Sequence, residues 1–390
     1  MFSFLFYLLA LGLIKAGLSQ QKKGRPQYKI VGFKDKITFE EGEGILLDYG
    51  IKIKKHLPLA NACLCLLDEI SAGFKSLAAD DNIEFIEDDY LARIQVLAST
   101  TETLKIASQN IPWGVRKIEA PDVWKRCQGE GIKVGIIDTG IDLGHPDLKD
   151  NIKEAYSVVD GASADDDNGH GTHVAGIIAA LDNDIGVVGV APKAEIYSVK
   201  AFDKKGRGTV SDIIDALQWC VENKVHVINM SFGIGTNSRA LKRAIGAAHR
   251  HNIIMVAAAG NSGGSDSVLY PAKYQEVIAV AASDSKDQAA EFSSRGPEVN
   301  IIAPGVDVSS TYINEEYKNL SGTSMACPHV VGACALLMSI SGTKAESVKK
   351  AILSTAKDIG LPEETQGVGL VNVSAAVSNI KKAKGGFFYE

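Results

Sequence analysis

The segment KVGIIDTGID, residues 133–142, is a run of apolar residues that ends on an aspartate and a Thr-Gly turn. Strands that read as continuous apolar runs are typical of a parallel sheet that is buried on both faces. Further apolar runs of strand length follow along the chain: EIYSVKAF (195–202), KVHVINMSF (224–232), NIIMVAAAG (252–260), VIAVAAS (277–283) and NIIAPG (300–305). We therefore predict that one parallel sheet organises most of this chain.

Amphipathic stretches of helical length separate several of these runs. Two examples are VSDIIDALQWCVENK (210–224) and SRALKRAIGAAHRHN (238–252). Strands that alternate with crossover helices predict an α/β fold with a doubly wound, mainly parallel sheet and helices on both faces. In such sheets reactive groups collect outside the carboxyl ends of the strands, and Asp138 stands at that end of the first run.

The N-terminal part of the chain has a different organisation. The order strand, helix, strand, strand, helix, strand predicts a small α+β module over residues 20–95. An exposed linker follows at 96–107, the α/β domain covers 108–380, and 381–390 form a short tail. The segments that carry the module's pattern include YKIVGFK (28–34), EEGEGILLDYG (40–50), NACLCLLDEI (61–70), SAGFKSLAADD (71–81) and a closing strand NIEFIEDDYLARI (82–94).

The chain opens with MFSFLFYLLALGLI, residues 1–14, an apolar run that is short for a membrane span and that small residues follow. We predict a signal peptide over residues 1–19, and hence a secreted protein with no stable membrane span after signal removal. Because no Lys or Arg precedes the run and Lys15 interrupts its end, an uncleaved N-terminal anchor is the alternative.

Composition and charge exclude several function classes. The 390 residues are 45% hydrophobic and 23% charged, which is ordinary for a globular chain with a large core. The formal net charge of -6 and the lack of long like-charge blocks argue against nucleic-acid binding. The cysteines show no zinc-like spacing, so we predict buried thiols at Cys63, Cys65, Cys127, Cys220, Cys327 and Cys334.

Three separated segments carry residues suited to nucleophilic catalysis. Asp138 ends a strand, His170 lies between two glycines in NGHGTHVAGIIAAL (168–181), and Ser324 precedes a helix in LSGTSMACPHVVGACALL (320–337). Each has an ordinary alternative, because Asp138 could cap a turn, His170 could be a surface histidine, and Ser324 could be a helix N-cap. His173 could also be the base, whereas a zinc pair of the two histidines lacks the acidic residue and third ligand.

Taken together, DTGID, HGTHVAG and GTSMACPH resemble the signature segments of the subtilisin-like (subtilase) serine peptidases, in the order Asp, His, Ser that is known for subtilisin. The resemblance extends from about residue 109 to about residue 376. It implies that Ser324 is the nucleophile, His170 the general base and Asp138 the carboxylate that orients the imidazole. Asn261 matches the oxyanion-hole asparagine. The resemblance thus implies a serine endopeptidase that acts through an acyl-enzyme intermediate.

The same resemblance implies how protein or peptide substrates bind. They add as a strand between the segments 205–210 and 231–233, with side-chain pockets beside it. Leu269 stands where several broad-specificity relatives have glycine, so we expect a shallower first pocket. The implied substrate-binding residues are Gly206, Gly208, Ser231, Phe232, Gly233, Ala258, Ala259 and Gly260.

A calcium site and a propeptide are implied as well. LDNDIGV (181–187) resembles the family's high-affinity Ca²⁺ loop, with oxygen ligands expected from Gln109, Asp147, Leu181, Asn183, Ile185 and Val187. The N-terminal module resembles the subtilisin propeptide, which assists folding, inhibits the active cleft and is removed autocatalytically. We place the maturation cut between about Gln95 and Ser108 and expect a monomer.

Two other functions fit parts of the sequence. The first is a catalytically silent protein of the same fold that binds a partner peptide or acts as a regulator, although all four catalytic positions are filled here. The second is a lipase or esterase, but the G-x-S-x-G elbow of those enzymes is absent around Ser324, where the chain reads GTSMA.

Overall fold

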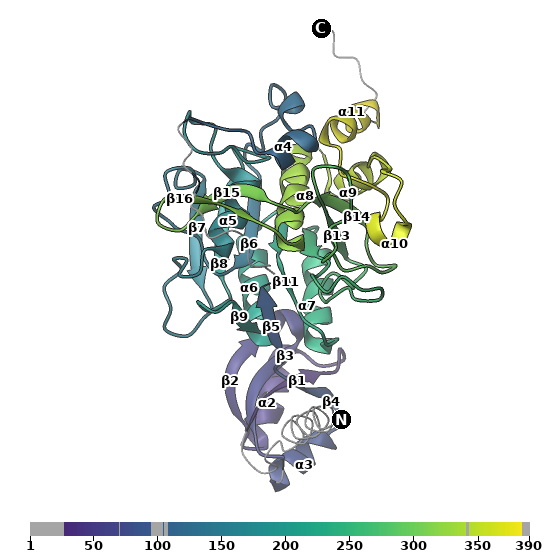
Figure 1. Cartoon of the computed structure of the whole chain (residues 1–390). Helices are drawn as coiled ribbons and strands as arrows, with labels where there is room; N and C mark the ends of the chain where they lie inside the picture. The colour runs from purple at the N-terminus through teal and green to yellow at the C-terminus, as the bar shows by residue number, and fades with distance from the viewer. Residues whose placement is uncertain (1–26, 70, 95–103, 105–107, 341–342, 384–390) are drawn as a thin grey trace, which may run out of the picture. The chain divides into compact units, whose positions relative to one another are not determined.

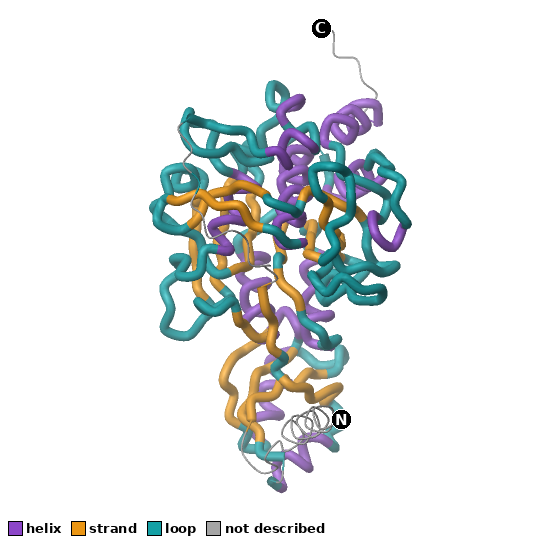
Figure 2. Tube along the Cα trace, in the orientation of Figure 1, coloured by secondary structure: helices purple, strands orange, loops and turns teal. Residues whose placement is uncertain are grey.

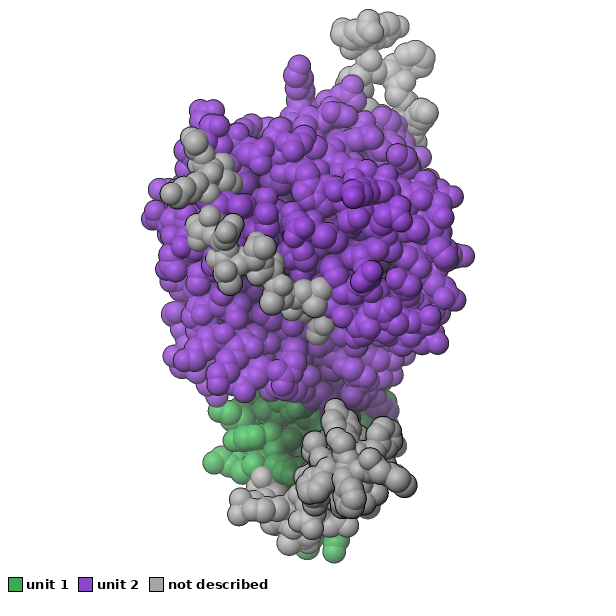
Figure 3. All heavy atoms as spheres, in the orientation of Figure 1, with its two compact units in different colours: residues 1–89 green, residues 90–390 purple. Residues whose placement is uncertain are grey.

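The computed structural model describes residues 27–69, 71–94, 104, 108–340 and 343–383. The predicted signal peptide and nearly all of the linker 96–107 lie outside the described residues. The chain forms two compact units, Met1–Asp89 and Tyr90–Glu390, which Figure 3 colours green and purple.

The first unit is a four-stranded antiparallel sheet with two helices. Its strand order is β2-β3-β1-β4, and its core includes Val31, Phe33, Leu46 and Leu77. The order of elements agrees with the strand-helix pattern predicted for this module. The elements are β1 (Gln27–Phe33), α2 (Phe39–Asp48), β2 (Lys52–Leu57), a 3₁₀ turn (Pro58–Ala60), β3 (Ala62–Leu67), α3 (Ala72–Ala78) and β4 (Ile83–Asp88).

The second unit contains the predicted parallel sheet. Its elements are β5 (Leu91–Ile94), α4 (Trp113–Lys117), a 3₁₀ turn (Pro121–Val123), β6 (Lys133–Asp138), β7 (Ile152–Ser157), α5 (His170–Ala179), β8 (Glu195–Lys200), β9 (Arg207–Thr209), α6 (Val210–Glu222), β10 (Val227–Met230), β11 (Phe232–Gly233), α7 (Arg239–Arg250), β12 (Ile254–Ala258), β13 (Val277–Ser283), β14 (Ile301–Pro304), β15 (Val308–Tyr312), β16 (Glu316–Leu320), α8 (Thr323–Met338), α9 (Ala345–Ser354), α10 (Glu363–Gln366) and α11 (Val373–Ala383). Figure 2 shows how helices and loops surround the strands.

The large sheet confirms the predicted α/β class. Its seven strands lie in the order β14-β13-β12-β10-β6-β8-β7 and all pair in parallel. Helix α8 runs through the centre of the unit and packs on β10, β12 and β13, and α6 packs against α7 (Figure 1). The strand order reverses at β6, between β10 and β8. Because ligands bind at such a switch point, the carboxyl end of β6 is the place where a site is expected.

Several elements differ from the sequence-based expectation, among them the run 224–232, which is divided between β10 and β11 in different sheets. The closing strand expected over residues 82–94 is two strands, since the chain leaves β4 at Asp88 and resumes as β5 at Leu91. β5 is the middle strand of a three-stranded antiparallel sheet with β11 and β9. Strand β7 was not anticipated, because the sequence IKEAYS is not an apolar run. As the last strand of the sheet it exposes Lys153, Glu154 and Tyr156 and needs no such run.

The cysteine prediction is confirmed, because all six thiols are free and buried. Burial raises the pKa of each thiol for which a shift is resolved, as at Cys65 and Cys334, where it reaches about 12. Within the part of the chain that the structure describes, no helix combines the length and apolar character needed to cross a bilayer.

Candidate active site

The carboxyl end of β6 presents Asp138 to the first residue of helix α5, His170. Asp138 Oδ1 lies 2.6 Å from His170 Nδ1, and both side chains are about 1% exposed. The same oxygen accepts a hydrogen bond from the Thr139 backbone N–H at 2.8 Å. A hydrogen bond to a carboxylate in such a buried place is short and strong, and it holds the imidazole with its Nδ1 proton toward Asp138.

Glycines on both sides of His170 allow this close approach. Gly169 has a φ of +105°, in the region that favours glycine, and a Cβ there would lie 2.3 Å from the Tyr312 ring. A Cβ on Gly171 would lie 2.0 Å from the Gly140 carbonyl oxygen. A side chain at position 171 would therefore push the start of α5 away from the end of β6, and one at position 169 would clash with Tyr312 of β15.

A second buried carboxylate, Asp166, joins the same two elements. It accepts hydrogen bonds from the hydroxyls of Thr139 at 2.9 Å and Thr172 at 2.7 Å. The backbone N–H groups of Asn168, Gly169 and Thr172 also donate to it, at 2.9 to 3.0 Å. Burial raises the pKa of Asp166, although these hydrogen bonds oppose the rise. The sequence analysis did not single out this residue, and the run of three aspartates before Asn168 was the only available signal.

Ser324 is the second residue of α8, which begins after Gly322. Its hydroxyl donates to the Ser231 carbonyl at 3.0 Å, and the Ser231 hydroxyl donates to the Ser324 carbonyl at 3.0 Å. His170 Nε2 is buried and has no hydrogen-bond partner among the described residues. Catalysis would thus require the Ser324 hydroxyl to turn from Ser231 toward Nε2. A hydrogen bond between a nucleophile and its general base often forms only when substrate is bound.

Asn261 is anchored by its oxygen end. Its Oδ1 accepts from the Thr323 N–H at 2.9 Å and from the Thr323 hydroxyl at 2.8 Å. The Thr323 hydroxyl in turn accepts from the Gly260 N–H at 3.1 Å. Because Oδ1 is held in this way against the start of α8, the NH₂ group of Asn261 is the end suited to donate to an oxyanion beside Ser324.

His173, the alternative base, is placed differently. Its ring is fully buried, with Nε2 3.0 Å from the Lys318 carbonyl oxygen. Burial lowers the pKa of His173 to about 3, so the ring stays neutral. Among the described residues, no three His, Cys, Asp or Glu side chains are grouped so that they could hold a metal ion.

Five of the residues implied in substrate binding, Gly206, Gly208, Ser231, Phe232 and Gly233, lie on or beside the two strands that flank β5, whereas Ala258, Ala259 and Gly260 lie at the end of β12. In β9, Gly208 pairs with Ala92, and in β11, Gly233 pairs with Arg93. The Ile94 N–H donates to the Gly206 carbonyl at 3.1 Å. Both edges are thus able to pair with one extended segment, which is the strand addition expected for substrate.

Leu269 lies between two walls of the expected first pocket. A Cβ on Gly233 would lie 2.4 Å from Leu269 Cδ1, and a Cβ on Gly260 would lie 3.0 Å from Leu269 Cγ. The Leu269 N–H is fixed by a bond of 2.9 Å to the Ala259 carbonyl. The neighbouring Ala258 is buried as well. The leucine side chain therefore fills space that glycine would leave open.

The predicted calcium ligands lie in one loop cluster around buried Asp147. Asp147 Oδ2 accepts from the Val187 N–H at 2.9 Å, whereas Asp147 Oδ1 is buried without a partner among the described residues. Gln109 Nε2 donates to the Leu181 carbonyl at 2.8 Å and lies 3.5 Å from Asn183 Oδ1. Burial raises the pKa of Asp147. An orphaned carboxylate oxygen among amide and carbonyl oxygens fits a hard cation.

Ile185, the sixth expected ligand, donates its N–H to Asn183 Oδ1 at 3.3 Å. Tyr317, which the sequence analysis missed, donates its hydroxyl to Asp147 Oδ2 at 3.0 Å. Burial, reinforced by the nearby Asp147 carboxylate, raises the pKa of the Tyr317 hydroxyl, so it remains a donor.

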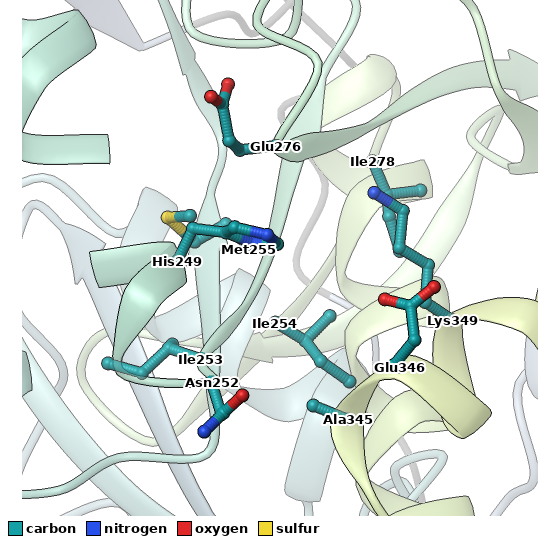
Figure 4. Close-up of a pocket in the computed structure, with 10 residues that line it drawn as sticks. All are labelled: His249, Asn252, Ile253, Ile254, Met255, Glu276, Ile278, Ala345, Glu346 and Lys349. Carbon is teal, nitrogen blue, oxygen red and sulfur yellow. The ribbon is translucent and has the colours of Figure 1, made fainter. Parts of the chain in front are cut away.

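A separate small cavity of about 90 Å³ lies at the start of β12 and of α9 (Figure 4). His249 lies on one side of it, and Glu346 and Lys349 of α9 lie on the other. None of the residues that line this cavity belongs to the three motif segments. The candidate active site is therefore the cluster at the carboxyl end of β6 and not this cavity.

Comparisons with known proteins point to one family. The model of the subtilase family matches residues 129–370. Subtilisin E of Bacillus subtilis (strain 168) is 39% identical over 382 residues, which cover 95% of this chain and 96% of that protein. Subtilisin DY of Bacillus licheniformis is 48% identical over 275 residues, which cover 69% of this chain and 99% of that protein.

We predict that Gly171→Ala reduces both stability and peptidase activity. The added methyl group meets the Gly140 carbonyl and Asp138, so it must displace α5 from β6. Overpacking of this kind costs about 1–3 kcal/mol of unfolding free energy, measured by denaturant titration. The matched control is Gly144→Ala, whose Cβ would meet only Asp142 Oδ1, at 3.6 Å. Equal effects of the two substitutions would contradict the steric argument.

Proposed function

Because the chain belongs to the subtilase family, and is thus a serine endopeptidase, we propose that it acts through Asp138, His170 and Ser324 and is secreted as an autoprocessed precursor. The observation that carries this proposal is the contact of 2.6 Å between two buried groups, Asp138 Oδ1 and His170 Nδ1, at the switch point of the sheet. Secretion is proposed from the apolar run at residues 1–14, with an uncleaved anchor as the alternative.

The chemistry follows from the positions of these groups. His170 Nε2 removes the proton from Ser324 Oγ as that oxygen attacks the scissile carbonyl carbon. The NH₂ group of Asn261 and the Ser324 backbone N–H donate to the resulting oxyanion. The imidazolium then protonates the leaving amine, the C–N bond breaks, and water hydrolyses the acyl-enzyme by the same steps. Asp138 keeps the Nδ1 proton in place and stabilises the imidazolium charge.

The proposed substrates are extended segments of proteins or peptides. Backbone hydrogen bonds to Gly206, Gly208 and Gly233 would hold such a segment regardless of its sequence. The proposed first pocket is bounded by residues 231–233 and 258–260, so its depth depends on Leu269, which lies between Gly233 and Gly260.

Strand β5 supports the proposal of an autoinhibited precursor. It pairs with both β9 and β11, the edges to which substrate would add. The described part of this strand ends at Ile94, next to the linker 96–107, where the maturation cut is proposed. Subtilisin DY supports the same proposal, because 69% of this chain matches 99% of its length. We propose that residues 20–95 form the inhibitory propeptide and that the mature enzyme is a monomer.

We propose that Ca²⁺ binds at Asp147. Asp147 Oδ1 and Oδ2, the Gln109 and Asn183 amide oxygens, and the Leu181, Ile185 and Val187 carbonyls would hold it. A bound cation would hold the loop that follows α5. Because Gln109 presents its Nε2 to the Leu181 carbonyl, a bound cation would require this amide to turn so that its oxygen faces the loop.

Labelling of Ser324 tests the proposed function. We expect a serine-directed fluorophosphonate to add one label to the wild-type chain and none to Ser324→Ala, as measured by intact mass, because only an activated serine reacts. Ser321→Ala is the matched control from the same segment and should label like wild type. An unlabelled wild type would favour the catalytically silent alternative. Hydrolysis of ester lipids but not of peptides would favour the esterase.

The same variant tests maturation. Ser324→Ala should accumulate as uncut precursor, whereas the wild-type product should begin between about residues 95 and 108, as measured by mass spectrometry of the secreted protein. A wild-type product that still begins near Gln20 would contradict autoprocessing. If Ser324→Ala is cut like wild type in a host free of other proteases, the cut is not made by this active site.

We predict that Leu269→Gly opens the first pocket. Wild type should disfavour large aromatic residues before the scissile bond, and the variant should raise kcat/KM for phenylalanine over alanine at that position by about 10-fold or more. A peptide library measures this ratio, with Leu143→Gly, in an exposed loop, as the control. A wild-type enzyme that already prefers large aromatics would refute the proposed role of Leu269.

Removal of the cation should destabilise the protein. Ca²⁺ at about 100 times its Kd contributes about 2.7 kcal/mol of unfolding free energy, which chelation removes. Thermal unfolding of Ser324→Ala, which avoids self-digestion, measures the loss. Asp147→Asn in this background should abolish the response to Ca²⁺, and Asp150→Asn, on the exposed turn nearby, should keep it. A full response in Asp147→Asn would place the cation elsewhere.

A further inference from the structure

Lys200 is a lysine with a fully buried side chain, at 1% exposure, at the carboxyl end of β8. It is the last residue of that strand and pairs in register with Asp138, the last residue of β6. Lysine is almost never fully buried without partners, because the ammonium group loses its hydration. The position of this charge beside the active site therefore needs an explanation.

The ammonium group of Lys200 has two partners, and each belongs to a segment that carries a triad residue. Nζ donates to the Thr139 carbonyl at 2.6 Å, and Thr139 directly follows Asp138. Nζ also donates to Asp167 Oδ1 at 2.6 Å, and Asp167 lies three residues before His170. One buried cation thus ties the backbone after Asp138 to the loop before His170.

Thr139 transmits this contact to the carboxylate of Asp138. Its N–H donates to Asp138 Oδ1, its hydroxyl donates to Asp166, and that hydroxyl accepts from the Gly171 N–H at 3.0 Å. The carbonyl bound by Lys200 is the remaining polar group of this residue. Rotation of the Thr139 backbone after loss of that bond would disturb the donor that orients Asp138 Oδ1.

The backbone of the same strand end holds the preceding carbonyl. The N–H groups of Ala201 and Phe202 donate to the Asp138 carbonyl at 2.8 and 3.2 Å. The residues that follow β8 thus fix the carbonyl of Asp138, and the Lys200 side chain fixes the carbonyl of Thr139. Two consecutive carbonyl groups are held from one strand end, which is more than sheet pairing alone requires.

We propose that Lys200 is a positioning residue of the catalytic machinery, which with Asp167 sets the orientation of Asp138 toward His170. This inference rests on the proposed roles of Asp138 and His170. The alternative is that Lys200 stabilises the fold and has no effect on the orientation of the triad. The two differ in what removal of the ammonium group does to the chemical step.

The experiment compares Lys200→Met with Asp167→Asn after maturation by added, removable wild-type enzyme. For Lys200→Met we expect kcat on a peptide p-nitroanilide to fall about 10- to 100-fold, with KM within about 3-fold, because the reacting groups are misplaced while the substrate strand still binds. Asp167→Asn keeps an acceptor and should lose less. If the residues act as a pair, the double variant should lose little more than Lys200→Met alone.

The pH profile of kcat/KM supplies a readout that a purely structural role would not move. The acid limb reports protonation of His170 in the free enzyme. Loss of the Lys200 cation should move this limb to higher pH, and loss of the Asp167 charge should move it to lower pH. Other titratable groups near His170 include Asp138 of β6, Asp166 of the same loop, Tyr312 of β15 and neutral His173 of α5, and both variants leave them intact.

Lys133→Met is the matched control, because Lys133 Nζ donates to the Asn223 carbonyl at 3.2 Å and Lys133 begins strand β6 at the opposite end from Asp138. It should keep the wild-type kcat and the wild-type position of the acid limb.

If Lys200→Met does not fold, the pH of the acid limb in Asp167→Asn tests the proposal instead. The proposal would be overturned if the acid limbs of the folded Lys200→Met and Asp167→Asn variants stay at the wild-type pH. It would also be overturned if Lys133→Met loses as much kcat as Lys200→Met. Absence of fluorophosphonate labelling in wild type would instead defeat the proposed function itself.

Discussion

The site depends on how closely the start of α5 can approach the end of β6. The contact of 2.6 Å between His170 Nδ1 and Asp138 Oδ1 is made between two side chains that water hardly reaches. Neither group could remain buried at low cost without the other, because an unpaired carboxylate in this place would lose its hydration. Because residue 171 is glycine, the backbone of α5 can pack closely against the Gly140 carbonyl. The Asp166 carboxylate then accepts hydrogen bonds from Thr139, which follows β6, and from Thr172 of α5.

Burial explains which strands can be predicted from the sequence and which cannot. Interior strands such as β6 and β12 are covered on both faces, so the residues between their ends are apolar and the pattern is visible in the sequence. The edge strand β7 is covered less and shows no such pattern. The break after Asp88 is also invisible in the sequence, since residues 91–94 are mostly apolar and read as a continuation of the same strand. Only pairing with β9 and β11 makes those residues a separate strand.

The same contrast holds inside the candidate site. Asp138, His170 and Ser324 each sit in a motif that can be read locally, whereas their supporting groups cannot. Lys200 is 61 residues from Thr139, and its bond to that residue exists only because β8 lies beside β6. In the sequence, Lys200 reads as the polar end of an apolar run. Tertiary packing determines which residues support the site, so these residues form no local sequence motif.

The hairpin of β15 and β16 shows how the cation loop and the triad share one support. At one end the Tyr312 hydroxyl donates to the Asn168 carbonyl, and its ring packs against Gly169. Further along, the Tyr317 hydroxyl donates to Asp147, the carboxylate of the proposed Ca²⁺ loop. The hairpin is therefore in contact both with Gly169, the residue before His170, and with Asp147, which accepts a hydrogen bond from Val187 of the loop after α5. A cation that orders Asp147 would fix one end of this hairpin, and through Tyr312 the hairpin limits how far Gly169 can move. Stability of the loop and geometry of the triad are thus two consequences of the same packing.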